Sequence, residues 1–162
     1  MQIREATADD WAEIHPFFAS TVEAGETYAY PDGLTSVEAR ALWMPGAPDR
    51  CVVAVGDDGT VLGSAKYGPN RPARGSHVGT ASFMVSPASR GRGVGRALGE
   101  HVVDALRAEG YAAIQFNAVV ETNTAAVRLW QALGFTVIGT VPEAFEHRTQ
   151  GRVGLHVMHR AL

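Results

Sequence analysis

Apolar residues in the first half of the chain alternate with turn residues, and their spacing predicts two helices and four strands. A cap at Thr7–Asp10 precedes Trp11, Ile14 and Phe17, which recur at helical spacing, although Pro16 should disturb this helix or end its first part. Thr35–Glu38 resembles a capping box that begins a second helix, ending at Trp43. The predicted strands are Gln2–Ala6, Cys51–Val55, Val61–Tyr67 and His77–Val85.

The hydrophobic period changes in the second half, where two amphipathic helices separate three more strands. Val94, Leu98 and Val102 share one face of a helix that Gly110 closes, and a second helix follows around Ala126–Leu133. The predicted strands are Ala112–Val120, Phe135–Val141 and Val153–Arg160. Gly68–Gly75, with two prolines and two glycines, is predicted to be a loop. Alternating helices and strands indicate an α/β (α+β) fold around one sheet, in a single domain spanning residues 1–162.

Composition narrows the class of protein further. The chain has 162 residues, of which 46% are hydrophobic and 19% charged, a balance typical of a globular domain. The formal net charge of −3 disfavours a protein that coats nucleic acid, so no nucleic-acid partner is expected. No stretch approaches the ~20 apolar residues that cross a bilayer, and the charged start lacks a signal-peptide core. We therefore expect a cytoplasmic protein with no membrane partner.

The sequence offers little for metal or disulfide chemistry. Cys51 is the one cysteine, which excludes an internal disulfide framework and a cysteine-based zinc cluster. His147, His156 and His159 lack the paired spacing of a zinc-binding helix. No metal site is expected.

The segment from Val85 to Arg96 carries the strongest chemical signal. A predicted strand ends, a glycine-rich loop follows, and a helix begins. Helix starts expose unpaired N–H groups and the positive end of the helix dipole, and glycines allow an anion to approach them closely. The glycines are Gly91, Gly93 and Gly95, and the neighbouring cations are Arg90, Arg92 and Arg96. The pattern indicates a diphosphate cradle, although a glycine-rich turn with solvated arginines is the alternative.

Spacing then selects among phosphate-binding loops. The segment lacks the Walker lysine and the third glycine of the dinucleotide fingerprint. Its Arg-x-x-Gly-x-Gly pattern, formed by Arg90, Gly93 and Gly95, resembles the acyl-CoA-binding signature of the GNAT family of N-acetyltransferases. Asn123–Phe135 resembles the second signature of that family, an Asn followed by Ala, an aromatic residue and Gly-Phe.

This resemblance implies a fold and a reaction. The expected fold is a mixed seven-stranded sheet with about four helices, in which the fourth and fifth strands part to admit the pantetheine arm. The expected reaction transfers acetyl from acetyl-CoA, as co-substrate, to an amine, with the N–H of Val85 or a neighbour at the thioester oxygen. The residues expected to contact acetyl-CoA are Phe83, Met84, Val85, Arg90, Gly91, Arg92, Gly93, Val94, Gly95, Arg96, Asn123 and Trp130.

Two residues of the second signature have alternative roles. Asn123 is expected to bond the pantetheine or thioester region, but it would also cap the following helix. Trp130 stands where many family members carry a tyrosine that is proposed to protonate the leaving thiolate. Because an indole N–H is not a useful acid, we expect Trp130 to pack or donate a hydrogen bond rather than transfer a proton.

The sequence does not single out the general base that would take the proton of the amine. The fourth strand contains no Asp or Glu, so the candidates are Glu26, Asp32, His77 and Glu121, and a water relay is the alternative.

For the acceptor amine, the resemblance implies a pocket lined by Glu26, Thr27, Tyr28 and Tyr30, which would face Phe116, Asn117 and Val119 of the fifth predicted strand. Asn117 is a polar residue in an apolar strand, so it should be buried and bonded either to the substrate or to neighbouring main chain; we also count it with Val85 and Asn123 as a catalytic candidate.

The loop Thr27–Pro31 is similar to the phosphinothricin and amino-acid acetyltransferase branch, and Phe116-Asn117 with Asn123 is similar to enzymes acting on proline analogues. The expected partner is a small amino-acid-like amine. A protein N-terminus or lysine as acceptor, and a non-catalytic acyl-CoA sensor, remain alternatives. A homodimer is expected by resemblance alone.

Overall fold

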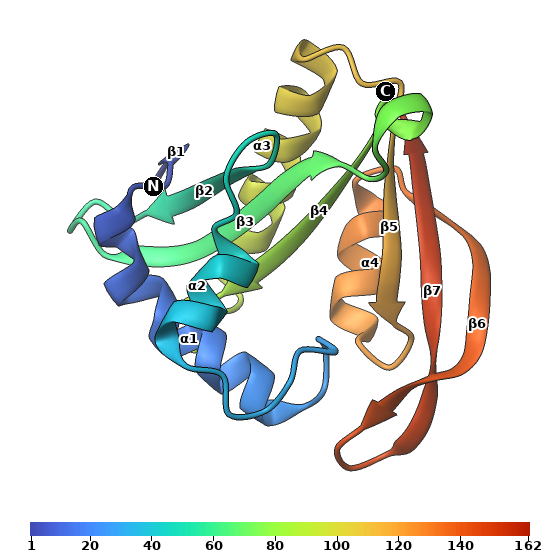
Figure 1. Ribbon diagram of the computed structural model, residues 1–162, viewed down its shortest axis with the longest axis horizontal. Helices are drawn as coiled ribbons and strands as arrows, with labels where there is room; N and C mark the ends of the chain where they lie inside the picture. The colour runs from blue at the N-terminus through green and yellow to red at the C-terminus, as the bar shows by residue number, and fades with distance from the viewer.

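A computed structural model describes residues 1–162 as one seven-stranded sheet covered by helices on both faces (Figure 1). The spatial order of the strands is β1-β2-β3-β4-β5-β7-β6. The strands are β1 (Gln2–Glu5), β2 (Arg50–Val55), β3 (Val61–Pro69), β4 (Val78–Val85), β5 (Ala113–Val120), β6 (Thr136–His147) and β7 (Gly151–Ala161). The helices are α1 (Trp11–Ala24), α2 (Ser36–Trp43), α3 (Val94–Ala108) and α4 (Thr124–Ala132). This element order confirms the expected mixed fold.

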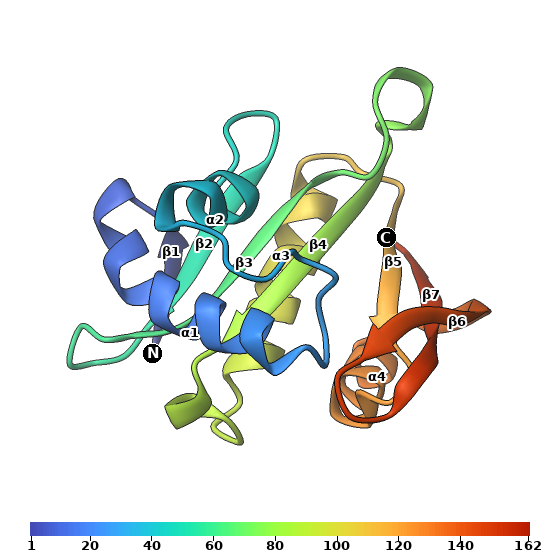
Figure 2. The same ribbon diagram turned by 60° about the horizontal axis from the view of Figure 1, so that its bottom comes forward.

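Alternation along the strands divides the core into two layers. In β2, Val52 and Ala54 join a cluster of 17 buried residues that includes the apolar faces of α3 and α4. Val53 points the other way, into a cluster of 10 buried residues with α1 and α2. Successive side chains of a strand face opposite sides of a sheet, so each central strand serves both layers. Figure 2 shows α1 and α2 together on one side of β1–β4.

The central strands β4 and β5 are parallel and separate soon after they meet. Their pairing is limited to Val78 with Ala113 and Gly79 with Ile114, after which the strands diverge (Figure 1). The expected parting of the fourth and fifth strands is therefore confirmed. It leaves the later half of β4 without a strand partner on that side.

Helix α1 differs from the sequence prediction because it continues through Pro16 without interruption. A proline inside a helix removes one backbone hydrogen bond and crowds the preceding turn. Ile14, Phe17 and Phe18, on either side of it, are 0%, 5% and 1% exposed. Burial of this apolar face is worth more than the missing bond.

The last two strands are also longer than predicted. β6 reaches His147 and β7 begins at Gly151, so the pair forms a hairpin that extends beyond the body of the sheet (Figure 1). Register shifts between Val137 and Gly139 and between Val141 and Phe145 mark bulges in β6. Because β6 is an edge strand, bulges and a proline are tolerated there and mask the strand pattern in the sequence.

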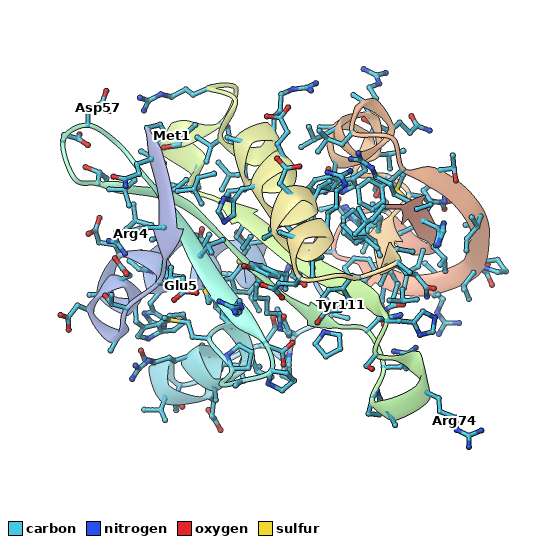
Figure 3. The ribbon with its side chains drawn as sticks, turned by 90° about the horizontal axis from the view of Figure 1, so that it is seen from above. Met1, Arg4, Glu5, Asp57, Arg74 and Tyr111 are labelled. Carbon is cyan, nitrogen blue, oxygen red and sulfur yellow. The ribbon has the colours of Figure 1, made fainter.

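Ion pairs fasten the opposite edge of the sheet. The amino group of Met1 lies 2.8 Å from Asp57, in the turn between β2 and β3 (Figure 3). Arg4 of β1 donates from both terminal nitrogens to the carboxylate of Asp10, at 2.7 and 2.8 Å. The second pair joins β1 to the segment that leads into α1. None of the helices combines the length and apolar character needed to cross a membrane.

Candidate active site

A cleft of about 680 Å³ opens where β4 and β5 part. Its walls are the later half of β4, the end of β5, the start of α3, one face of α4 and the loop after α1. Of the residues expected to contact acetyl-CoA, the cleft is lined by Phe83, Met84, Val85, Arg90, Gly91, Gly93, Val94, Gly95, Arg96, Asn123 and Trp130. The structure thus brings together both sequence signatures, although Gly95 and Asn123 are 28 positions apart along the chain.

The start of α3 forms one end of the cleft. Gly91 and Gly93 have φ values of +75° and +80°, a left-handed conformation that other residues adopt at a cost, and open space surrounds both. Gly93 is the N-cap of α3, and no side chain caps the helix. The first N–H groups of an uncapped helix have no partner within it. This end of the cleft therefore presents free N–H donors and the positive end of the α3 dipole.

The remaining residues of the glycine-rich segment divide between the cleft and its support. Arg90 and Arg96 line the cleft and supply positive charge, whereas Arg92, expected to do the same, does not line it. Gly95 lines the cleft but serves mainly packing, because a Cβ there would lie 3.3 Å from Leu129 of α4. The glycines thus serve two purposes, an open approach to the helix N–H groups at Gly91 and Gly93 and close packing of α3 on α4 at Gly95. The sequence pattern alone does not separate these purposes.

The middle of the cleft is the free edge of β4. Ser86 donates its N–H to Leu62 of β3, and strand pairing alternates, so Met84 also bonds toward β3. The main-chain groups of Phe83 and Val85 therefore point away from β3, into the gap left by β5. The hydroxyl of Tyr28 binds both main-chain groups of Phe83. The N–H of Val85 has no such side-chain partner.

Trp130 and Asn123 form the wall contributed by α4. Trp130 is 7% exposed, and its ring lies 4.6 Å from that of Phe83 and 5.1 Å from that of Phe116. These contacts make it a packing residue between the parted strands. The side chain of Asn123 accepts the N–H of Ala126 at 3.3 Å, so it caps α4 while lining the cleft.

The opposite end of the cleft lies against the loop after α1. Glu26, Thr27 and Tyr28 line it, as expected for the acceptor side, and Glu26 is the only carboxylate among the lining residues. Tyr30 does not line the cleft. It stacks on Tyr28, with ring centroids 5.4 Å apart, and lines a separate hollow beside Arg148.

The expectation that Asn117 is buried and lines the acceptor pocket was wrong. It is exposed rather than buried, does not line the cleft, and donates to the side chain of Asn70 at 2.6 Å. Alternation along β5 places Asn117 opposite the buried Ile114 and Phe116, on the same face as Gln115, whose side-chain amide donates to it at 2.8 Å.

The other candidate bases lie outside the cleft lining. Asp32 faces Arg148 at 3.5 Å. Glu121 accepts the N–H of Gly154 at 2.6 Å and so fastens β7 to the end of β5. His77 is exposed just before β4. The geometry leaves Glu26 as the one candidate within the cleft, and no group of three or more His, Cys, Asp or Glu side chains is arranged to hold a metal ion.

Several lining residues were not anticipated from the sequence. They are Thr21, Ser82, Ser89, Ala118, Val120, Ala125, Ala126 and Leu129, whereas Val119 lines the cleft as expected. Helical spacing could have indicated Ala126, one turn before Trp130, and Leu129, three residues after Ala126. The others depend on how the strands part, which no local pattern reveals.

The fold and the cleft define an acetyltransferase, and comparison with known proteins supports this. Residues 7–135 match the family described as the Acetyltransferase (GNAT) family. The chain belongs to the GNAT family and is an N-acetyltransferase by class.

Three similar proteins illustrate this relationship. The structure of a GCN5-related N-acetyltransferase from Kribbella flavida is 62% identical, with a TM-score of 0.96, and the match covers 99% of this chain and 97% of that one. An L-methionine sulfoximine/L-methionine sulfone acetyltransferase from Salmonella typhimurium is 32% identical over 88% of this chain and 84% of its own length. The structure of yncA from the same species, described with its cofactor acetyl-CoA, is 28% identical with a TM-score of 0.83, covering 100% and 94%.

Proposed function

We propose that this chain transfers the acetyl group of acetyl-CoA to the amine of a small amino-acid-like substrate. The observation that carries the proposal is the polarity of one continuous cleft, with free helix N–H groups, Arg90 and Arg96 at one end and Glu26 at the other. An anionic coenzyme suits the first end, and an ammonium group suits the second.

The residues at the first end fit the diphosphate of coenzyme A. Gly91, Gly93 and the start of α3 would bind its oxygens through main-chain N–H groups, and Arg90 and Arg96 would add charge-assisted contacts. The apolar walls of Phe83, Trp130 and Leu129 suit the pantetheine arm. Acetyl-CoA bound to a relative with 28% identity supports this assignment.

The reaction proposed is direct attack. The amine nitrogen forms a bond with the thioester carbon, the carbon–sulfur bond breaks, and the thiolate of coenzyme A leaves. Negative charge on the carbonyl oxygen is stabilised by the N–H of Val85, a donor worth roughly 3 kcal/mol in comparable sites. Asn123, which caps α4, can contribute a second polar contact. The proton lost by the amine passes to Glu26 directly or through water.

The substrate class follows from the acceptor end. Thr21, Thr27 and Tyr28 line this end together with a single carboxylate, Glu26, which favours a small ammonium group. The relative from Salmonella typhimurium acts, by its name, on methionine sulfoximine and methionine sulfone, both small amino acids. This relationship favours a free amino acid or analogue over a protein chain.

Release of free thiol from acetyl-CoA tests the proposal. The assay compares amino acids, methionine sulfoximine, proline analogues, polyamines and peptides, with Glu26→Gln as the variant. We expect turnover with an amino acid or analogue, and a kcat/KM at least ~10-fold lower for the variant.

Turnover with peptides alone would contradict the small-molecule assignment. Binding of coenzyme A without turnover on any amine would instead favour a non-catalytic acyl-CoA sensor.

A further inference from the structure

Arg148, at the tip of the hairpin formed by β6 and β7, contacts the loop after α1 in two places. Its main-chain N–H donates to the carbonyl of Gly25 at 3.0 Å. Its guanidinium lies 3.5 Å from the carboxylate of Asp32. Between these two residues lies the segment Glu26–Tyr28, which lines the acceptor end of the cleft. One residue of the hairpin therefore holds the loop on both sides of the segment that forms this end of the cleft.

Gly25 allows the hairpin to approach the loop closely. A Cβ at this position would lie 2.9 Å from the Nε atom of Arg148 and 3.1 Å from its Cβ, closer than side chains normally pack. Gly25 also ends α1 in a left-handed conformation, with φ +61°, which a residue with a side chain adopts at a cost. The close approach and the turn at the end of α1 thus both require the glycine.

The rest of the interface between the loop and the hairpin is open. A hollow of about 450 Å³ lies beside Arg148 and is lined by Tyr30 from the loop and by Phe145 from the hairpin. Because the two segments are separated there, their contact is concentrated at Arg148. The ion pair with Asp32 adds little by itself, since the two side chains are 50% and 76% exposed. The main-chain bond to Gly25 is the firmer contact.

The tip of the hairpin is a firm support for this contact. Phe145 is 6% exposed and packs with Val120 of β5 and Val153 of β7. The ring of His147, also buried, accepts the N–H of Thr149 at 3.3 Å and so closes the turn. The tip is thereby fixed to the group β5–β7, whereas the loop after α1 belongs to the layer packed on β1–β4. The contact joins the two groups of strands at the end where β4 and β5 have parted (Figure 1).

We propose that Arg148 is a positioning residue, which holds the loop after α1 and so sets where Glu26 and Thr27 meet the acceptor amine. The inference rests on the proposed function, because that proposal assigns this end of the cleft to the amine and the α3 end to coenzyme A. Arg148 does not line the cleft itself, so it acts through the loop. Loss of the contact should therefore weaken binding of the amine and leave binding of the coenzyme unchanged.

Gly25→Ala tests the contact because the added methyl group would push the loop away from Arg148. Gly33→Ala is the matched control: Gly33 lies in the same loop with φ +73°, but nothing lies within 4 Å of where its Cβ would be. Both variants place a side chain at a positive φ, so both should have a lower melting temperature. We expect the KM of the amine to rise at least ~10-fold for Gly25→Ala and less than about threefold for Gly33→Ala. The Kd of coenzyme A should change less than about threefold in both.

Arg148→Ala tests the same contact from the hairpin without changing the backbone of the loop. It removes the guanidinium and keeps the main-chain bond, so the KM of the amine should rise only about threefold. Arg148→Lys keeps a cation beside Asp32 and should recover part of this loss. Arg152→Ala is the control, because Arg152 is exposed on the same hairpin and lines neither the cleft nor the hollow. A merely structural role of Arg148 would lower the melting temperature and leave the KM of the amine unchanged.

Amide hydrogen exchange, measured by NMR, separates failure of this inference from failure of the proposed function. The N–H of Arg148 should exchange slowly in the wild type and at least ~10-fold faster in Gly25→Ala. Fast exchange in the wild type, or an unchanged KM of the amine in both Gly25→Ala and Arg148→Ala, would overturn the role of Arg148. Slow exchange at Arg148 in a wild type that acetylates no amine would contradict the proposed function instead.

Discussion

Arg90 and Arg92 stand two residues apart on one loop, but only Arg90 lines the cleft. If the diphosphate of coenzyme A lies at the α3 end of the cleft, Arg90→Ala should raise the Kd of coenzyme A about 10-fold at low salt, since charge-assisted phosphate contacts are strong. Arg92→Ala, which removes the same charge from the same loop, should change the Kd less than about threefold. Calorimetry at two ionic strengths measures both. Equal losses in the two variants would mean that general charge, and not a contact, attracts the coenzyme.

Trp130 bridges the parted strands by packing rather than by acid chemistry. The centroid of its ring lies 4.6 Å from that of Phe83. Trp130 also shares a cluster with Phe116 and Phe135, in which the ring centroids are 4.3 to 6.4 Å apart. Trp130→Phe removes part of this contact and should lower the free energy of unfolding by about 1–2 kcal/mol. Because no proton passes through the indole, kcat should stay within about threefold of the wild type. Urea denaturation and thiol release measure the two effects, and a large loss of kcat in a stable variant would contradict the packing role.

At the scale of elements, the junction between β4 and α3 depends on backbone conformation. Gly93 has φ +80° with open space where a Cβ would lie, so Gly93→Ala meets conformational strain without a steric clash. The strain should cost about 1–2 kcal/mol of stability. It should also turn the first N–H groups of α3 away from the ligand and weaken coenzyme A binding at least ~10-fold.

Gly110 provides the control for this element. It has φ +84°, also with nothing within 4 Å of a Cβ, but it lies after the other end of α3. Gly110→Ala should lose similar stability in thermal melts and leave the Kd of coenzyme A unchanged. If both variants bind alike, the glycine at the start of α3 serves the fold alone.

The connection between β1 and α1 makes stability depend on pH. The hydrogen bonds from Arg4, together with those from Thr7, lower the pKa of the Asp10 carboxyl to about 2. A lowered folded-state pKa stabilises the protein above the unfolded value near 3.9, and this contribution is lost as the pH falls through about 2. Arg4 is partly exposed, so we expect a contribution of about 1–2 kcal/mol. Asp10→Asn should therefore be less stable at pH 7 in urea titrations, with the difference shrinking toward pH 2. If the difference in stability between Asp10→Asn and the wild type did not change with pH, the loss would come from packing rather than from the charge of Asp10.

For the whole molecule, the order of elements could be predicted from the sequence because hydrophobic period and caps are local properties. The coenzyme end of the cleft was also accessible, since Arg90 and the glycines lie within one short segment. At the acceptor end, Glu26, Thr27 and Tyr28 line the cleft as expected from the sequence, whereas Tyr30 and Asn117 do not. Asn117 lies on a face of β5 that no other element buries, and the pairing of Tyr28 with Phe83 joins segments 55 residues apart. Such contacts arise only when the sheet has formed and its central strands have parted.

That parting leads to a prediction for the molecule as a whole. Two groups of strands, β1–β4 and β5–β7, meet at only two residue pairs between β4 and β5, with α3 and α4 packed behind. A coenzyme lying in the cleft would contact both groups, and it should stabilise the folded state because it binds that state alone. At a concentration of 100 times its Kd, linkage alone contributes about 2.7 kcal/mol, or roughly 5–10 °C in melting temperature for a chain of this size.

Thermal melts with acetyl-CoA, coenzyme A and adenosine 3′,5′-bisphosphate separate the contributions. At equal multiples of their Kd the first two should raise the melting temperature equally, because linkage depends on occupancy alone. The bisphosphate reaches only the α3 end, so it should slow amide exchange around Gly91 and leave Val119 and Val120 of β5 unprotected, whereas the full coenzyme should protect both sides. Equal protection of β5 by both ligands would mean that the pantetheine arm does not lie between the parted strands.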